Sequence, residues 1–225
     1  MPTQGPVFAS KSDFAYEEVR SRILSGAISP GAIIGQAKLA TEIGLSTTPL
    51  REALKRLATE GLVTLDNHRD ARVVELSSDE AQHLFEVRAT VDPLACALAA
   101  ERRTVHDLTR IDAALRDLEP LTGAPTTQAL IAHRAFHRAI YLSAGNPLLV
   151  NILDSIWDKG DLYRLRALRS RTPSAEDRVR VHEQHQALRE AISEGNVKAA
   201  ESLSRAHVTH SLGRRAIGLL DEPSE

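Results

Sequence analysis

Cysteine and aromatic residues are scarce in this 225-residue chain, and both shortages exclude classes of protein. The single thiol, Cys96, excludes an intramolecular disulfide and a four-cysteine zinc site, and it fits a reducing compartment. Aromatic residues make up 4% of the chain, whereas alanine, leucine and arginine are abundant, which predicts a mostly helical protein. Because no apolar run reaches the roughly 18 residues needed to cross a bilayer, and the N-terminus lacks an apolar signal segment, we expect a cytoplasmic protein without a membrane partner.

An excess of charge of one sign is also missing. The chain has 28 Lys and Arg against 30 Asp and Glu, for a formal net charge of −2. This balance argues against a protein coated in positive charge, but it leaves room for a local basic surface.

The first third of the chain has the pattern of a winged helix-turn-helix domain. Hydrophobic periodicity predicts helices near residues 13–24, 38–43 and 48–59, followed by strand-like runs at 62–65 and 73–76 around a polar turn. We therefore assign residues 1–12 to a flexible tail and residues 13–76 to a winged helix with a small β-hairpin.

The remainder of the chain has helical periodicity throughout. Ser77 and Glu80 have the spacing of a capping box, and Ser174 with Asp177 repeats it. Helical segments follow one another to about Leu220, the last of them expected to run unbroken from Asn196. The predicted fold class is mainly α, with an all-α bundle of six or seven helices over residues 77–220 and a polar tail at 221–225.

The third predicted helix has the composition of a DNA recognition helix. Its N-terminus carries the hydroxyls of Ser46, Thr47 and Thr48, and Arg51 and Lys55 follow. Hydroxyls and free amides at a helix N-terminus suit phosphate oxygens, and an arginine can bind a guanine edge in the major groove. However, residues 1–76 carry nine Lys and Arg against nine Asp and Glu, and winged helices also serve as protein-interaction modules, so the composition alone leaves both uses open.

A family resemblance favours DNA binding. The segment LATEIGLSTTPLREALKRLATEGLV, with NHRDARV in the predicted wing, resembles the DNA-binding domain of GntR-family bacterial transcription regulators over about residues 14–75. The resemblance implies that operator DNA is contacted from the recognition helix and from the wing. The candidate DNA-binding residues are Ser46, Thr47, Thr48, Arg51, Lys55, His68, Arg69 and Arg72.

Two residues depart from the family pattern. Thr47 stands where the family usually has arginine, and Asp70 stands where the wing usually has glycine. The loss of a DNA-gripping arginine and the gain of an acid near phosphate imply a different operator or weaker binding at a given salt concentration.

The helical part carries three pairs of histidines at helical spacing. His133 and His137 are four residues apart, and the pairs His182/His185 and His207/His210 are each three apart. Neutral imidazoles from three helices can converge on a metal ion inside a bundle, although a single such pair is more often structural. Arginine follows His133 where a metallopeptidase motif would need glutamate, so we do not expect an enzyme.

A second resemblance selects among these histidines. Residues 78–212 are similar to the FCD effector domain of the FadR-like branch of the GntR family, through HRAFHRAIYLSAGNP and QHQAL. The resemblance implies one divalent ion held by His133, His137, His185 and His207, with His133 in place of the family's aspartate. Four neutral nitrogens favour zinc, with nickel possible, over manganese or calcium.

The resemblance also implies an effector. Members of this branch bind small carboxylates in the bundle, often on the metal, and Arg88 matches a recurrent arginine that could pair with such a carboxylate. The alternative for Arg88 is a structural ion pair with Asp92, four residues on. We therefore expect a homodimeric transcription regulator, acting as a repressor, whose operator affinity is set by a small organic acid bound at a metal site. A regulator whose effector is the divalent metal itself is the alternative.

Overall fold

The structure of the protein is a computed structural model that describes residues 10–65, 70–120, 122 and 125–220. Its contacts divide the chain into two compact units, Met1–Glu75 and Leu76–Glu225, each with its own core.

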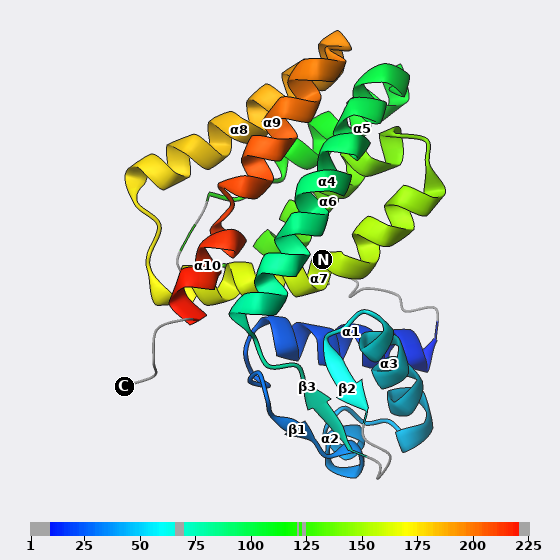
Figure 1. Ribbon diagram of the computed structural model, residues 1–225. Helices are drawn as coiled ribbons and strands as arrows, with labels where there is room; N and C mark the ends of the chain where they lie inside the picture. Colours follow the sequence, from blue (N-terminus) through cyan, green and yellow to red (C-terminus); the bar gives the residue numbers. More distant parts are fainter. Residues whose placement is uncertain (1–9, 66–69, 121, 123–124, 221–225) are drawn as a thin grey trace, which may run out of the picture. The chain divides into compact units, whose positions relative to one another are not determined.

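The first unit is a winged helix-turn-helix (Figure 1). Its elements are, in chain order, α1 (Lys11–Leu24), β1 (Ile33–Ile34), α2 (Gln36–Glu42), α3 (Thr47–Thr59), β2 (Val63–Leu65) and β3 (Ala71–Val73). The strands form one antiparallel sheet in the order β1-β3-β2, with Val63 opposite Val73 and Ile33 opposite Arg72. The predicted hairpin is therefore present, and the two-residue β1 adds a third strand that the pattern did not predict.

Local signals explain where these helices begin and turn. Ser10 accepts a hydrogen bond from the backbone N–H of Asp13 at 3.1 Å, so α1 starts at Lys11, two residues before the predicted start. Gly44 adopts φ +71° in the turn between α2 and α3, a conformation that favours glycine. Leu50, Leu54 and Leu57 bury the inner face of α3 completely.

The second unit is all helical and has seven helices within its described residues. The sequence predicted six or seven. They are α4 (Ser78–Arg102), α5 (Val105–Arg116), α6 (Thr127–Ser143), α7 (Pro147–Ser170), α8 (Ala175–Glu194), α9 (Val197–Thr209) and α10 (Leu212–Leu220). The mainly α fold with a small sheet is thus confirmed.

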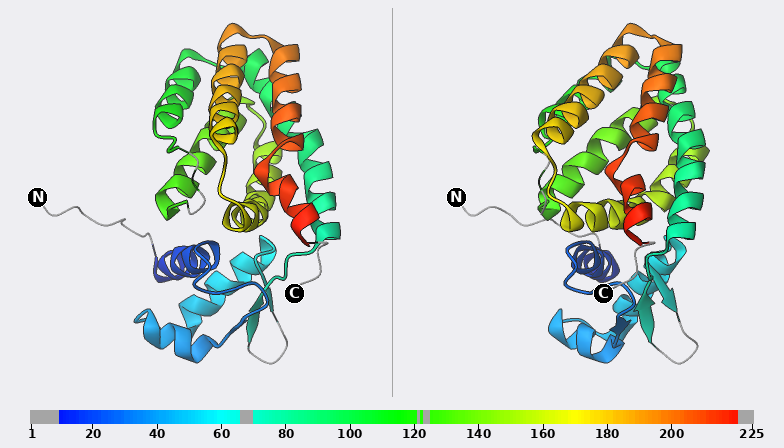
Figure 2. Two further views of the ribbon diagram at one scale, coloured as in Figure 1. Left: turned by 90° about the vertical axis from the view of Figure 1, so that its left-hand side faces the viewer. Right: turned by 60° about the vertical axis from the view of Figure 1, so that its left-hand side comes forward.

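The helices of the second unit pack as an antiparallel bundle. In Figures 1 and 2, α9 runs along α4 in the opposite direction, and α8 lies beside α9. Phe136, Ile140 and Trp157 belong to the larger core between α4, α6, α7, α8 and α9. Phe85 and Tyr163 belong to a smaller core where α10 packs against α7 and α4.

The end of the chain differs from the prediction of one continuous helix. The helix breaks at His210 and Ser211, and α10 begins at Leu212. Arg180 on α8 donates a hydrogen bond to the backbone carbonyl of His210 at 3.3 Å. At this break, the backbone carbonyl of His210 therefore accepts a hydrogen bond from a side chain of another helix. Within the described residues, every helix is too short or too polar to span a bilayer.

Candidate functional site

Four histidines from three helices meet inside the second unit. His133 and His137 come from α6, His185 from α8 and His207 from α9. Each offers one ring nitrogen, and these four nitrogens all lie within 4.8 Å of one another. Their rings are in contact, with centroids 5.0 Å apart for His137 and His207 and 5.7 Å apart for His133 and His185. The structure therefore brings together the four residues that the resemblance singled out, and they could hold one metal ion.

Three ring nitrogens of this cluster have no hydrogen-bond partner among the described residues. His133 Nδ1, His137 Nε2 and His185 Nε2 are buried and make no hydrogen bond to any described residue. A buried polar atom without a partner costs free energy, commonly about 1–3 kcal/mol. Three such nitrogens within one cluster of imidazoles fit a bound cation, which would accept lone pairs from the cluster.

The surroundings keep these imidazoles neutral, the form that binds a metal. Burial, with neighbouring positive charge, holds the pKa values of His133, His137 and His185 well below the usual range. Burial, together with the positive charge of Arg88, lowers the pKa of His207 to about 4 against the opposing effect of Asp92. The ligand nitrogens are therefore unprotonated at neutral pH.

The tautomer of His207 is set by its neighbour. Gln184 Oε1 lies 3.1 Å from His207 Nδ1, and because an amide oxygen only accepts, Nδ1 donates the hydrogen bond. This leaves Nε2 of His207 with a free lone pair. A second partner that orients the ring in this way is typical of metal-binding histidines.

The other histidines and the flanking arginines lie outside the cluster. His182 is exposed on α8, and His210 Nδ1 contacts the backbone carbonyl of Ala206 at 2.8 Å. Arg134 pairs with Asp158 at 2.5 Å, and Arg138 pairs with Asp154.

Arg88 is held in a buried ion pair next to the cluster. Its Nη2 lies 2.7 Å from Asp92 Oδ2 and its Nε lies 3.4 Å from Asp92 Oδ1, so the structural alternative for this residue is present. Its guanidinium also lies 5.1 Å from the centre of the Trp157 ring. Although it is paired with Asp92, Arg88 also lines the smaller of two cavities beside the histidines.

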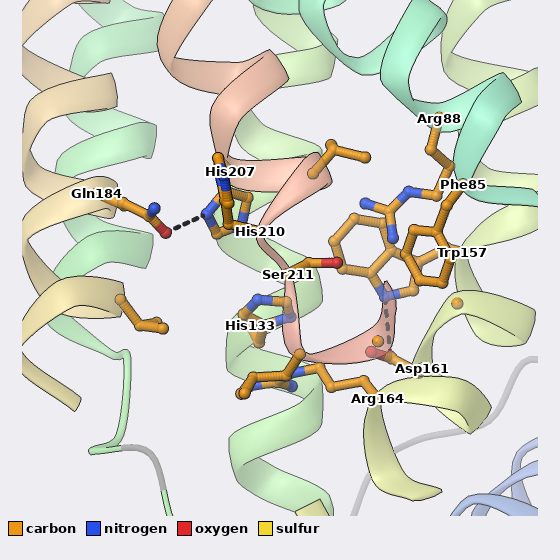
Figure 3. A pocket seen from close by; sticks show the side chains of 15 residues that line it. Phe85, Arg88, His133, Trp157, Asp161, Arg164, Gln184, His207, His210 and Ser211 are labelled. Carbon is orange, nitrogen blue, oxygen red and sulfur yellow. Dashed lines mark hydrogen bonds between the residues drawn. The ribbon is translucent and has the colours of Figure 1, made fainter. Parts of the chain in front are cut away.

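Two cavities flank the histidine cluster. The smaller one, about 40 Å³, is shown in Figure 3 and is lined by Arg88, His133 and His207 among others. The larger one, about 510 Å³, is lined by residues of α6, α7, α8 and the α5–α6 connection, including His133 and His185. His133 and Arg164 belong to the walls of both.

Sequence reasoning missed the polar face that α7 presents to this site. Trp157 Nε1 donates a hydrogen bond to Asp161 Oδ2 at 2.9 Å. Gly160 leaves room for Arg88, because a Cβ at this position would lie only 2.9 Å from Arg88 Nη1. Arg164 lies one turn further along the same helix. The spacing Trp157, Gly160, Asp161, Arg164 follows one helix face, so polar residues at this interval were a usable signal.

The first unit carries the candidate DNA-binding surface. Thr47, Arg51 and Lys55 follow one another at intervals of four on α3, and all three are exposed, opposite the buried leucines. Ser46 is the N-cap of the helix and Thr48 lies in its first turn, both exposed. The structure therefore places all five candidates from this helix on its solvent side.

The wing is described only in part. Arg72 on β3 is exposed, and its Nη1 donates a hydrogen bond to the backbone carbonyl of Gly31 at 2.7 Å. Asp70 is also exposed. The candidates His68 and Arg69 lie outside the described residues.

Comparison with protein families matches both units. Residues 11–73 match the family described as bacterial regulatory proteins, gntR family. Residues 83–210, which hold all four histidines of the cluster, match the FCD domain.

Individual relatives and solved structures agree with these matches. The HTH-type transcriptional repressor GlaR of Escherichia coli is 28% identical over 198 residues, covering 86% of this chain and 90% of GlaR. The gluconate operon transcriptional repressor of Bacillus licheniformis is 25% identical over 185 residues, covering 78% and 72%. The structure of E. coli McbR/YncC has the same fold, with a TM-score of 0.74 at 23% identity over 95% of this chain and 98% of that one. The chain therefore belongs to the GntR family of bacterial regulatory proteins and, with its FCD domain, is a DNA-binding transcriptional regulator.

Proposed function

We propose that the protein is a repressor whose affinity for operator DNA is controlled by a small carboxylate bound at a metal site in the FCD domain. The observation that carries the proposal is the convergence of four histidine nitrogens within 4.8 Å of one another. Three of these histidines also have a buried ring nitrogen without a hydrogen-bond partner among the described residues. GlaR and the gluconate operon regulator are both named repressors, which supports the direction of control.

Zinc is the metal that the donor set favours. Four neutral imidazole nitrogens suit zinc, with nickel as a second choice, better than they suit manganese or calcium, which prefer oxygen. When bound, a divalent ion supplies positive charge to which a carboxylate oxygen can bind. The imidazoles leave that charge uncompensated, because His133 stands where the family has an aspartate.

The chain's own residues have distinct roles in this proposal. His133, His137, His185 and His207 hold the ion, and Gln184 orients the ring of His207. Arg88 stays a proposed contact for the carboxylate, since it lines the smaller cavity with His133 and His207 even though Asp92 occupies two of its N–H groups.

DNA recognition is proposed for the exposed face of α3 and for the wing. The proposed contacts are Ser46, Thr47, Thr48, Arg51, Lys55, His68, Arg69 and Arg72. A homodimer would bring two such faces onto paired half-sites. The carboxylate changes operator affinity only if it favours one arrangement of the DNA-binding domains over another.

The proposal is tested with DNA duplexes selected from a random library on the purified zinc-loaded protein. Fluorescence anisotropy measures their affinity while a panel of carboxylates is added. We expect at least one acid to weaken binding by the wild type and to have no effect on His137→Gln, whereas His83→Gln, an exposed histidine on α4, responds like the wild type.

Two results decide against the proposal. If the acid acts equally on His137→Gln and on the wild type, the metal site does not mediate the response. If zinc alone changes DNA affinity and no acid adds to the change, the alternative holds, in which the metal itself is the effector.

A further inference from the structure

Arg164 is a partly buried cation that lacks an acceptor at one buried nitrogen. Its Nη1 is buried and makes no hydrogen bond to any described residue. The neighbouring arginines differ, because Arg88 is bound by Asp92 and Arg134 by Asp158. Burial lowers the pKa of Arg164, and Asp161, whose Oδ2 accepts from Trp157, opposes that change only in part. A buried N–H donor of a cation that has no acceptor is costly, so this nitrogen is a place where an anion is favoured.

Arg164 lies where an anion would also meet the histidine cluster. Figure 3 shows its side chain next to His133, and both residues belong to the walls of the two cavities. His185 lines the larger cavity as well. A carboxylate in that cavity therefore meets walls that carry both imidazoles and a guanidinium.

The volumes of the two cavities decide which one takes an organic ligand. The cavity beside Arg88, about 40 Å³, has room for a water-sized group. The cavity beside Arg164 holds about 510 Å³, within the roughly 300–1,000 Å³ range of small-molecule sites. The body of an organic ligand therefore fits the larger cavity, whereas the smaller one has room for a group of a few atoms.

The walls of the larger cavity indicate the kind of skeleton. Much of the lining is apolar, contributed by Leu118, Pro120, Pro125, Ala129, Val179 and Val181. Glu119 and Glu183 line the same cavity, and they would repel a second carboxylate on the ligand. Arg178, the other arginine of the wall, donates its Nη1 to the backbone carbonyl of Pro173.

We infer that the effector is a monocarboxylate with an apolar body, which occupies the cavity between α6, α7, α8 and the α5–α6 connection with its carboxylate toward His133 and Arg164. This inference rests on the proposed function and names the ligand class of the same site. Arg164, which the sequence comparison with the family did not single out, is its anionic-group contact.

The test is isothermal titration calorimetry on the zinc-loaded full chain with three sodium salts, acetate, hexanoate and 3-phenylpropanoate, and with 3-phenylpropanamide as the neutral analogue. We expect 3-phenylpropanoate and hexanoate to bind about tenfold or more tightly than acetate, because their apolar bodies are buried. The amide is expected to bind about tenfold or more weakly than the matching acid.

Two pairs of variants locate the site. Arg164→Gln should weaken binding of 3-phenylpropanoate about tenfold or more, whereas Arg166→Gln, an exposed arginine on the same helix, should not. Ala129→Trp fills the cavity without removing a polar group, so it should block 3-phenylpropanoate and leave zinc binding intact. Ala135→Trp, exposed on α6 and outside both cavities, is its control. Circular dichroism checks that each variant is folded. If Arg164→Gln does not fold, the result with Ala129→Trp decides the test.

Several results would overturn the inference. These are failure of all three acids to bind the wild type, acetate binding as tightly as the larger acids, the amide binding as tightly as its acid, or unchanged binding by folded Arg164→Gln or Ala129→Trp. Failure of the proposed function looks different: the acid binds and depends on Arg164, but operator affinity does not respond, or the chain does not retain zinc.

Discussion

Arg88 and Asp92 lie one helical turn apart on α4 and form a two-point ion pair at the edge of the histidine cluster, with Nη2 2.7 Å from Oδ2. Tyr141 donates a further hydrogen bond to the same Asp92 oxygen at 2.8 Å. The Asp92 side chain is 3% exposed, so the pair is sheltered from water and each charge depends on the other. The contact holds the first helix of the FCD domain against α6.

Breaking this pair should destabilise the protein strongly. Asp92→Asn leaves the Arg88 charge buried without its counterion, which costs about 3–5 kcal/mol in free energy of unfolding. The exposed pair of Arg205 and Glu201 is the matched control, and Glu201→Gln should cost less than about 1 kcal/mol. Urea unfolding measures both, and equal small effects would mean that the Arg88 pair is well solvated.

Zinc should raise the stability of the folded chain. A ligand that binds only the native state adds about 4 kcal/mol when its free concentration is a thousand times its Kd. We expect a chelator to lower the unfolding midpoint of the wild type and to leave that of His137→Gln unchanged. A wild-type midpoint that does not move on chelation would argue against a metal at this cluster.

The metal-free protein should lose stability as the pH falls below about 6.5, the ordinary pKa of histidine. The folded pKa values of the four histidines are lowered, that of His207 to about 4, so between those values the unfolded chain binds more protons. Their contribution is fully present above pH 6.5 and falls by up to about 1.4 kcal/mol per pH unit for each group.

Urea unfolding of the metal-free protein at pH 7.5 and 5.5 checks this dependence. His207→Gln should reduce the difference between the two pH values, and His83→Gln, which changes an exposed histidine, should not. Equal stability of the wild type at both values would contradict the burial of the cluster.

Arg51 should contribute to DNA affinity mainly through charge. Arg51→Ala should weaken binding to a random-sequence duplex and reduce the slope of log K against log salt by about 0.9 if one phosphate contact is lost. Arg116→Ala, an exposed arginine in the FCD domain, should leave both quantities unchanged. Anisotropy titrations over a range of salt provide the slope, and an unchanged slope in Arg51→Ala would remove the residue from the interface.

Two glycines of α10 should respond oppositely to alanine. A Cβ at Gly213 would lie 2.6 Å from Phe85 Cζ, with the backbone of Gly160 and Arg164 3.4 Å away, so Gly213→Ala should cost about 1–3 kcal/mol. Apart from its chain neighbours and the backbone of its own helix, no described heavy atom lies within 4 Å of a Cβ at Gly218. Gly218→Ala should therefore stabilise by about 0.5–1 kcal/mol, because alanine favours a helix. A stable Gly213→Ala would show that α10 packs less closely on Phe85.

Much of the fold could be predicted because its signals are local. Helix α6 spans Thr127–Ser143, inside the region where the sequence has helical periodicity, and Ser174 with Asp177 forms a complete capping box at the start of α8. The capping box at Ser77 is only half formed, because the carboxylate of Glu80 binds Lys159 and Tyr163. The short β1 and the break before α10 escaped prediction, since both depend on partners distant in sequence.

The site shows the same division. The spacing of His133 and His137 places them on one face of one helix, but only the family resemblance selected His185 and His207 from their pairs. Arg164 gave no such signal by itself, because its importance lies in a missing partner. An unbonded nitrogen can be recognised only after the fold has buried it.

The carboxylate of Asp177 joins two segments that are far apart in the chain. It accepts hydrogen bonds from the backbone of Ser174 at the start of α8 and from Arg215 on α10. The first turns of α8 also supply Val179 and Val181 to the wall of the larger cavity. We therefore expect a molecule that displaces this wall to strain the contact between Asp177 and Arg215, so that α10 responds to occupancy of a chamber for which it supplies no lining residue.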